Sequence, residues 1–122
     1  MHRLLVIEED AEVRRHLCEA LEAEGYRVLV AADGQAGLCL FREDPADLVL
    51  LNLSISGRDS VDLIRQFHRL SRTSKIIAIS GGIENWQFLT VSSYLGDHMM
   101  LQKPFSRQKL LEVVRMQLSS PR

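Results

Sequence analysis

Five polar side chains that could bind a metal ion or a phosphoryl group follow short apolar runs of this chain. They are Glu8 and Glu9 after LLVI, Asn52 after LVLL, Ser80 at the end of KIIAIS, and Lys103 after MMLQ. Apolar runs of this kind are typical of buried parallel strands, whose carboxyl ends meet at one edge of a sheet. We therefore expect two carboxylates, an amide, a hydroxyl and an ammonium group to converge at that edge.

The chemistry available at this edge depends on Asn52, which stands at the tip of the predicted third strand. A carboxylate at this place could attack phosphorus or hold a metal ion, whereas an amide does neither well. Phosphoryl transfer to a side chain needs an anionic nucleophile in line with the leaving group. The sequence therefore predicts a site that does not accept phosphate.

Short apolar runs alternate with amphipathic stretches along the chain, which predicts an alternation of strands and helices. Strands are expected at Arg3–Ile7, Tyr26–Ala31, Asp47–Leu51, Lys75–Ser80 and His98–Leu101. Helices are expected at Ala11–Glu24, with Asp10 as its N-cap and Gly25 as its stop, and from Asp33-Gly34 to just before Pro45. Further helices are expected at Val61–Leu70, at Glu84–Leu95, and from a Ser106 cap to about Leu118. Five β-rich runs joined by helices imply a doubly wound α/β fold, with one five-stranded parallel sheet covered on both faces.

Composition narrows the kinds of protein that this chain can be. Of its 122 residues, 46% are hydrophobic, and we expect residues 1–122 to form a single domain with no second domain attached. The formal net charge of -1 does not indicate nucleic acid or an anionic membrane as a partner. The chain has no apolar run of the ~20 residues that span a bilayer and no signal peptide, so a cytoplasmic location is expected. Cys18 and Cys39 lack metal-site spacing and are expected to be reduced thiols on helices.

Four stretches, LLVIEED, ADLVLLN, IIAIS and LQKPF, resemble in this order the receiver domain of two-component response regulators. The resemblance covers essentially the whole chain and implies the flavodoxin-like (βα)5 receiver fold. It implies that Glu8 and Glu9 match the acidic pair that binds Mg²⁺, and that Asn52 occupies the position of the phosphoacceptor aspartate. Ser80 then matches the hydroxyl, and Lys103 the lysine, that contact the phosphoryl oxygens.

The chain departs from the family pattern at several positions. The backbone carbonyl of Ser54 would match the third protein ligand of the metal, but Glu9 is one methylene longer than the usual aspartate. Met100 stands where the family often has an aromatic switch residue, and Ile55–Ser60 lacks the usual Met-Pro-Gly-x-Asp-Gly pattern. We therefore expect a degenerate, non-enzymatic receiver with weak or no Mg²⁺ binding and no cofactor. In it, Lys103 should pair with Glu8 or Glu9 and donate a hydrogen bond to the Asn52 carbonyl.

The resemblance implies a signalling module that binds a protein partner independently of phosphorylation. That partner would be a histidine kinase, another receiver or a second copy of the chain. The expected interaction face includes Trp86, Tyr94, Met100 and Arg107, although the apolar residues of Trp86–Leu95 could instead be core. Basic residues are expected on solvated faces, including Arg14, Arg65, Arg69 and Arg72.

Two alternatives stay open. The chain could be a conventional phosphorelay receiver whose acceptor aspartate has been changed to Asn52. It could also be a non-covalent sensor of an anion or small ligand, which Ser80, Lys103 and the backbone amides of Gly81 and Gly82 would hold.

Overall fold

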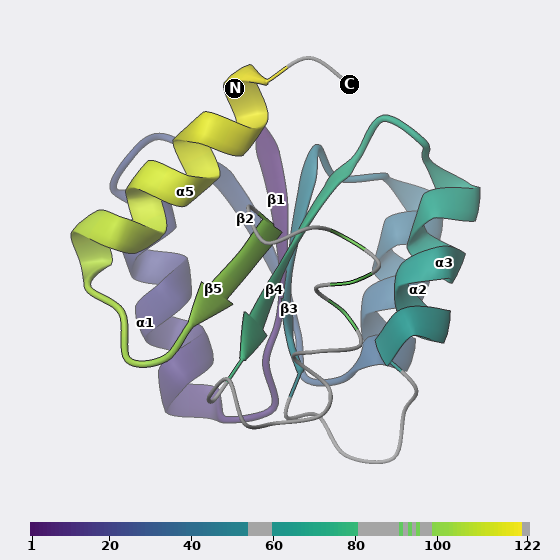
Figure 1. The fold of residues 1–122 in the computed structure, drawn as a ribbon, viewed down its shortest axis with the longest axis horizontal. Coiled ribbons are helices and arrows are strands. Elements are labelled where there is room, and N and C mark those ends of the chain that lie inside the picture. Colours follow the sequence, from purple (N-terminus) through teal and green to yellow (C-terminus); the bar gives the residue numbers. More distant parts are fainter. Residues whose placement is uncertain (54–59, 81–90, 92, 94, 96–98, 121–122) are drawn as a thin grey trace.

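A computed structural model of the chain describes residues 1–53, 60–80, 91, 93, 95 and 99–120. The strands in this part of the chain form one parallel sheet in the order β2-β1-β3-β4-β5 (Figure 1). Their bounds are β1 Arg3–Ile7, β2 Arg27–Ala31, β3 Leu48–Asn52, β4 Lys75–Ser80 and β5 Met100–Gln102. Strand β2 lies on one side of β1, and β3, β4 and β5 follow on the other side. The order in which strands are added to the sheet therefore changes direction between β1 and β3.

Helices cover both faces of the sheet, which confirms the predicted doubly wound fold. The helices α1 (Ala11–Glu22) and α5 (Arg107–Ser119) lie on one face. The helices α2 (Gly34–Glu43) and α3 (Ser60–Leu70) lie on the other (Figure 1). The helix expected at Glu84–Leu95 falls mostly outside the described residues. Of its residues, the structure places only Val91, Ser93 and Leu95, and each is helical.

Capping residues at the ends of α1 and α5 act as the sequence predicts. The Asp10 carboxylate accepts hydrogen bonds from the backbone N–H groups of Glu12 and Val13, and the Ser106 hydroxyl accepts one from Lys109. Helix α1 stops at Glu22, two residues earlier than expected, because the chain has already begun to turn toward Gly25. Gly25 has φ 93°, a left-handed conformation that suits glycine at the end of a helix.

Two strands are shifted along the sequence from their predicted positions. Strand β3 begins at Leu48, and the carboxylate of the preceding Asp47 accepts a hydrogen bond from the backbone N–H of Arg3 at 2.7 Å. It ends at Asn52, which pairs in register with Ile79 of β4. Strand β5 begins at Met100, and the His98 position proposed for its start lies outside the described residues. The following Lys103–Pro104 bond is cis, an isomer that the sequence pattern did not predict.

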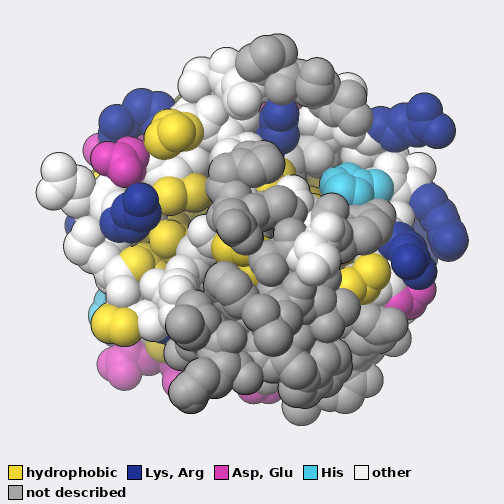
Figure 2. Space-filling model, in the orientation of Figure 1, with side chains coloured by type: hydrophobic (Ala, Val, Ile, Leu, Met, Phe, Trp, Pro, Cys, Tyr) yellow, Lys and Arg dark blue, Asp and Glu magenta, His cyan; other side chains and the backbone are white. Residues whose placement is uncertain are grey.

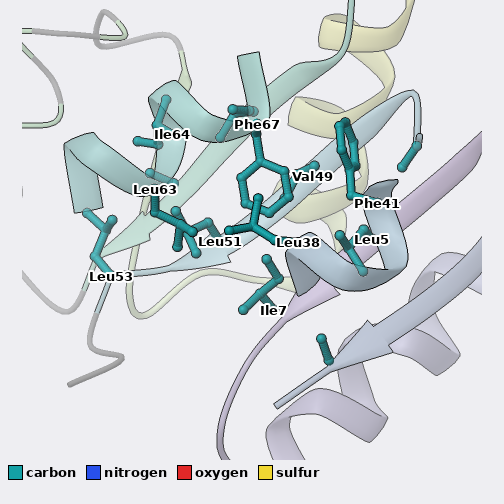
Figure 3. Close-up of a cluster of buried hydrophobic side chains, with 14 of the residues drawn as sticks. Leu5, Ile7, Leu38, Phe41, Val49, Leu51, Leu53, Leu63, Ile64 and Phe67 are labelled. Atoms are coloured by element: carbon teal, nitrogen blue, oxygen red, sulfur yellow. The ribbon is translucent and has the colours of Figure 1, made fainter. Parts of the chain in front are cut away.

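Two apolar clusters hold the central strands in place, one on each face of the sheet. On the α2–α3 face, Phe41 and Phe67 meet edge to face with ring centroids 5.0 Å apart (Figure 3). On the α1–α5 face, Leu21 and Val114 are completely buried in the second cluster. Burial of one such side chain stabilises the fold by roughly 1.5–3 kcal/mol. The middle of the sheet is therefore fixed from both sides.

Helix α2 comes very close to β1 at Gly37, near the strand tip that leads into Glu8. A Cβ atom at residue 37 would lie only 2.6 Å from Cδ1 of Ile7 and 3.0 Å from its Cγ1. Ile7 is 1% exposed and belongs to the cluster in Figure 3, so it has little room to move. The absence of a side chain at Gly37 thus sets how closely α2 packs against this end of β1.

This close packing predicts a coupling between Gly37 and Ile7. The Gly37→Ala substitution should be more favourable in an Ile7→Val background than in the native chain, by about 1 kcal/mol in the free energy of unfolding. The reason is that Ile7→Val removes Cδ1, the atom that the new methyl group would strike. Urea unfolding of the four proteins of this double-mutant cycle measures the coupling. Cys39→Ala, at an exposed position of the same helix, should show no such coupling, and a coupling below about 0.3 kcal/mol for Gly37 would contradict the packing argument.

Candidate functional site

Three buried polar side chains lie at the carboxyl ends of neighbouring strands. Glu8 follows β1, Asn52 ends β3 and Ser80 ends β4, with exposed fractions of 2%, 2% and 0%. Because β1, β3 and β4 are adjacent and parallel, these strand ends share one edge of the sheet. The structure thus brings together residues that the sequence places up to 72 positions apart.

The Glu8 carboxylate is held by two hydrogen bonds. The side-chain amide of Asn52 donates through Nδ2 to Glu8 Oε1 at 2.5 Å, and the backbone N–H of Asp10 donates to Oε2 at 3.0 Å. Burying a carboxylate without partners costs several kcal/mol, so these donors are what allow Glu8 to lie inside the protein. The amide group of Asn52 therefore has a structural task that a carboxylate at the same place could not perform.

Arg14 adds a positive charge close to the tip of β1. Its Nη1 donates to the backbone carbonyl of Glu8 at 2.8 Å and reaches that of Glu9 at 3.5 Å. The guanidinium therefore ties the first turns of α1 to the loop that carries the acidic pair. Sequence reasoning placed Arg14 on a solvated face, and only its spacing after the acidic pair could have indicated this contact.

Lys103 reaches the site through its backbone and not through an ion pair. Its N–H donates to the carbonyl of Ser80 at 2.8 Å, which places it beside the end of β4. The expected ion pair with Glu8 or Glu9 was wrong, because the structure of the described residues shows neither carboxylate within salt-bridge distance of Lys103. Glu8 instead takes its hydrogen bonds from Asn52 and Asp10, while the Lys103 side chain is half-buried.

The remaining members of the predicted metal site do not add a third buried carboxylate. Glu9 is exposed to solvent, and Ser54 lies outside the described residues. Within the part of the chain that is described, no group of three or more His, Cys, Asp and Glu side chains lies close enough to hold a metal ion. Glu8 is therefore the one buried acid among the residues described at this edge.

The predicted interaction face is described only in part. Trp86 and Tyr94 lie outside the described residues. Met100 is half-buried and packs against the cluster on the α2–α3 face. Arg107 is exposed and, with Phe105 and His16, lines a groove of about 390 Å³ between α1 and α5. Val91 is 1% exposed, so this residue of the predicted fourth helix is core, as the alternative reading proposed.

The two cysteines lie on helices, as predicted, and away from the strand tips. Both are free thiols, with Cys18 half-buried on α1 and Cys39 exposed on α2. Burial, together with the nearby carboxylate of Glu22, raises the pKa of the Cys18 thiol. A thiol with a raised pKa is less often present as the nucleophilic thiolate at neutral pH.

Comparison with known proteins places this geometry in a family. A family model described as the response regulator receiver domain matches residues 4–115. The transcriptional regulatory protein CpxR of Klebsiella pneumoniae is 31% identical over 115 residues, which make up 94% of this chain and 48% of CpxR. The transcriptional regulatory protein YxdJ of Bacillus subtilis is 31% identical over 118 residues, or 97% of this chain and 51% of YxdJ. The chain thus spans about half the length of these relatives.

Solved structures show the same fold. A CheY-like response regulator receiver domain protein from Methanospirillum hungatei superposes with a TM-score of 0.86 at 24% identity, covering 97% of this chain and 94% of that one. A response regulator from Thermotoga maritima superposes with a TM-score of 0.84 at 26% identity, covering 98% and 99% of the two chains. Among the described residues of the present chain, no helix has the length and apolar character needed to cross a bilayer.

The two acids at the tip of β1 should differ sharply in their effect on stability. Glu8→Ala should lower the free energy of unfolding by about 1–3 kcal/mol, because it removes the acceptor of the buried hydrogen bond from the Asn52 amide and of the part-buried one from the Asp10 N–H. Glu9→Ala, one residue later and exposed, should change it by less than about 0.5 kcal/mol. Urea unfolding followed by circular dichroism measures both. Equal effects of the two substitutions would mean that the Glu8 hydrogen bonds do not contribute in solution.

Proposed function

The chain belongs to the response regulator receiver domain family, and we propose that it acts in two-component signalling without accepting a phosphoryl group. In this proposal residues 1–122 form one receiver-like domain, and Asn52 stands at the phosphoacceptor position. The observation that carries the proposal is the buried hydrogen bond from Asn52 Nδ2 to Glu8 Oε1 at 2.5 Å. Through it, the acceptor position supplies a hydrogen-bond donor and not an attacking oxygen anion.

The chemistry of the amide supports an inert acceptor position. Transfer of a phosphoryl group needs a nucleophile with a lone pair directed at phosphorus and a negative charge to drive the attack. The lone pair of the Asn52 nitrogen is held in amide resonance, one of its hydrogens is donated to Glu8, and the amide oxygen is neutral. Asn52 therefore cannot play the part of the family's aspartate.

The donor set at the strand tips fits Mg²⁺ poorly. Receiver domains typically bind Mg²⁺ through carboxylates, and this ion demands near-octahedral oxygen ligands. In this chain the two oxygens of Glu8 are already engaged by Asn52 and Asp10, and Glu9 points into solvent-exposed surroundings. An elementary charge at about 4 Å is worth roughly 4 kcal/mol at an effective dielectric of 20, before desolvation is counted. The neutral amide at position 52 removes attraction of that order, so we propose that Mg²⁺ binding is weak.

A fixed conformation is the functional consequence that we propose. The Glu8–Asn52 bond joins β1 to β3, and the Lys103 amide joins the chain after β5 to the end of β4. These contacts hold the strand tips together without a phosphoryl group or a metal ion. Receiver domains work with histidine kinases, so the proposed output is phosphorylation-independent binding of a kinase, another receiver or a second copy of this chain.

Incubation with acetyl phosphate and Mg²⁺ should leave the intact mass of the native chain unchanged, because position 52 provides no nucleophile. The Asn52→Asp variant serves as the matched control, since it restores the carboxylate and leaves Ser80 and Lys103 in place. A phosphoryl adduct on the native chain would refute the proposal. An adduct on Asn52→Asp alone would mean that the rest of the pocket is competent and that the site has lost only its nucleophile.

The same variant should reveal the structural task of the amide. Without Mg²⁺, Asn52→Asp should lower the free energy of unfolding by about 1–3 kcal/mol, because a donor facing Glu8 becomes a second acid. Adding millimolar Mg²⁺ should restore part of this stability, since a ligand that binds only the folded state stabilises it. Thermal unfolding in EDTA and in Mg²⁺ measures both effects. In the absence of Mg²⁺, the double variant Glu8→Gln/Asn52→Asp should not show the loss of unfolding free energy expected for Asn52→Asp. A strong rise in the melting temperature of the native chain on adding Mg²⁺ would contradict the proposal that its metal site is weak.

A further inference from the structure

A cluster of positive charge on helix α3 and in the turn after it shares no residue with the strand-tip site. Arg65, His68, Arg69 and Arg72 line an open surface depression of about 420 Å³, and we refer to these four residues as the α3 basic patch. The three arginines are exposed, and the histidine is half-buried. Figure 2 shows several Lys and Arg side chains gathered on the side of the molecule where α3 lies, with a histidine beside them.

The arginines of the patch follow one line along the helix. Arg65 and Arg69 are four residues apart on α3, and Arg72 follows three residues later in the turn after the helix. The backbone N–H of Ser71 still bonds to the carbonyl of Phe67, so the helical path continues almost to Arg72. With a rise of about 1.5 Å per residue, Arg65 and Arg69 are separated by about 6 Å along the helix axis. The patch is therefore a short row of guanidinium groups at helical spacing.

Part of this positive charge is not neutralised. Within the described residues, Arg69 and Arg72 form no ion pair. One acid shares this face of the helix, Asp62, which lies one turn before Arg65 and accepts a hydrogen bond from Gln66 at 2.9 Å. The face thus begins with a negative charge and continues with three positive ones.

Stabilisation of the helix does not account for the whole patch. Basic residues in the last turn of a helix interact favourably with its dipole, and this explains Arg69 and His68. It does not explain Arg65, which stands in the middle of α3, or Arg72, which stands beyond its end.

We propose that the α3 basic patch binds an acidic α-helix of a partner protein. Carboxylates at positions i, i+4 and i+7 of such a helix repeat the spacing of Arg65, Arg69 and Arg72, so each can meet one guanidinium group. The helical spacing of the arginines favours a partner that repeats it, as the carboxylates along one face of an acidic helix do.

Fluorescence anisotropy with synthetic peptides tests the proposal. The first probe, the ordered peptide, is a labelled alanine-based helical peptide with glutamates at i, i+4, i+7 and i+11. The second, the rearranged peptide, has the same composition, but its glutamates are distributed over all sides of the helix. The ordered peptide should bind at least about tenfold more tightly. Its binding should weaken as salt is raised, since exposed charges are screened. Circular dichroism verifies that both peptides are helical.

Charge changes in the protein locate the binding surface. Arg69→Glu/Arg72→Glu should weaken binding of the ordered peptide by about tenfold or more. A matched control, Arg27→Glu/Lys109→Glu, reverses two exposed positive charges elsewhere and should leave the affinity within about twofold. Far-ultraviolet circular dichroism establishes that every variant is folded.

Three outcomes would overturn the proposal. Equal binding of the ordered and rearranged peptides would show attraction to charge without helix recognition. Tighter binding of a twelve-nucleotide single-stranded DNA, lost in Arg69→Glu/Arg72→Glu, would assign the patch to nucleic acid. Absence of binding to either peptide at low salt would make the patch a solvated surface.

Discussion

A buried carboxylate that needs hydrogen-bond donors is the constraint on which the strand-tip site depends. Glu8 is 2% exposed, and its two oxygens are met by the Asn52 amide and the Asp10 backbone N–H. The first donor comes from β3 and the second from the start of α1, so satisfying one side chain fixes three elements relative to one another. Replacing the amide by a carboxylate would turn the strongest of these contacts into a repulsion.

This constraint can be met only because the sheet around it is rigid. Strands β1 and β3 are neighbours, and the apolar clusters on both faces bury their side chains almost completely. Close packing leaves the strand tips little freedom to separate. The hydrogen bond from Asn52 to Glu8 joins groups 44 residues apart in the sequence, so it depends on the register between β1 and β3. The core therefore does more than stabilise the domain, because it sets the geometry of the pair.

The site and the α3 basic patch are two different kinds of feature. The strand-tip site is buried, and its Glu8 carboxylate is satisfied by internal hydrogen bonds, whereas the patch is exposed and carries charge that the described residues do not fully neutralise. A domain with the inert pocket that we propose can still transmit a signal through its surface. The two proposals are independent, since binding at α3 does not require a particular residue at position 52.

Much of the fold was predictable from the sequence, because its signals are local. The apolar runs gave the strands to within a few residues, and Asp10, Gly25 and Ser106 marked helix ends through capping chemistry that involves only near neighbours. The alternation of elements predicted the doubly wound sheet, and the positions of Glu8, Asn52, Ser80 and Lys103 after strands predicted a shared edge.

The partners within that edge were decided by the tertiary structure. The sequence predicted that Lys103 would neutralise an acid, but Glu8 takes its donors from Asn52 and Asp10. Residue types cannot reveal such a choice, because it depends on register, burial and side-chain direction across the sheet. The α3 basic patch shows the same limit, since a row of arginines becomes a common surface only when the helix and the turn after it are placed together.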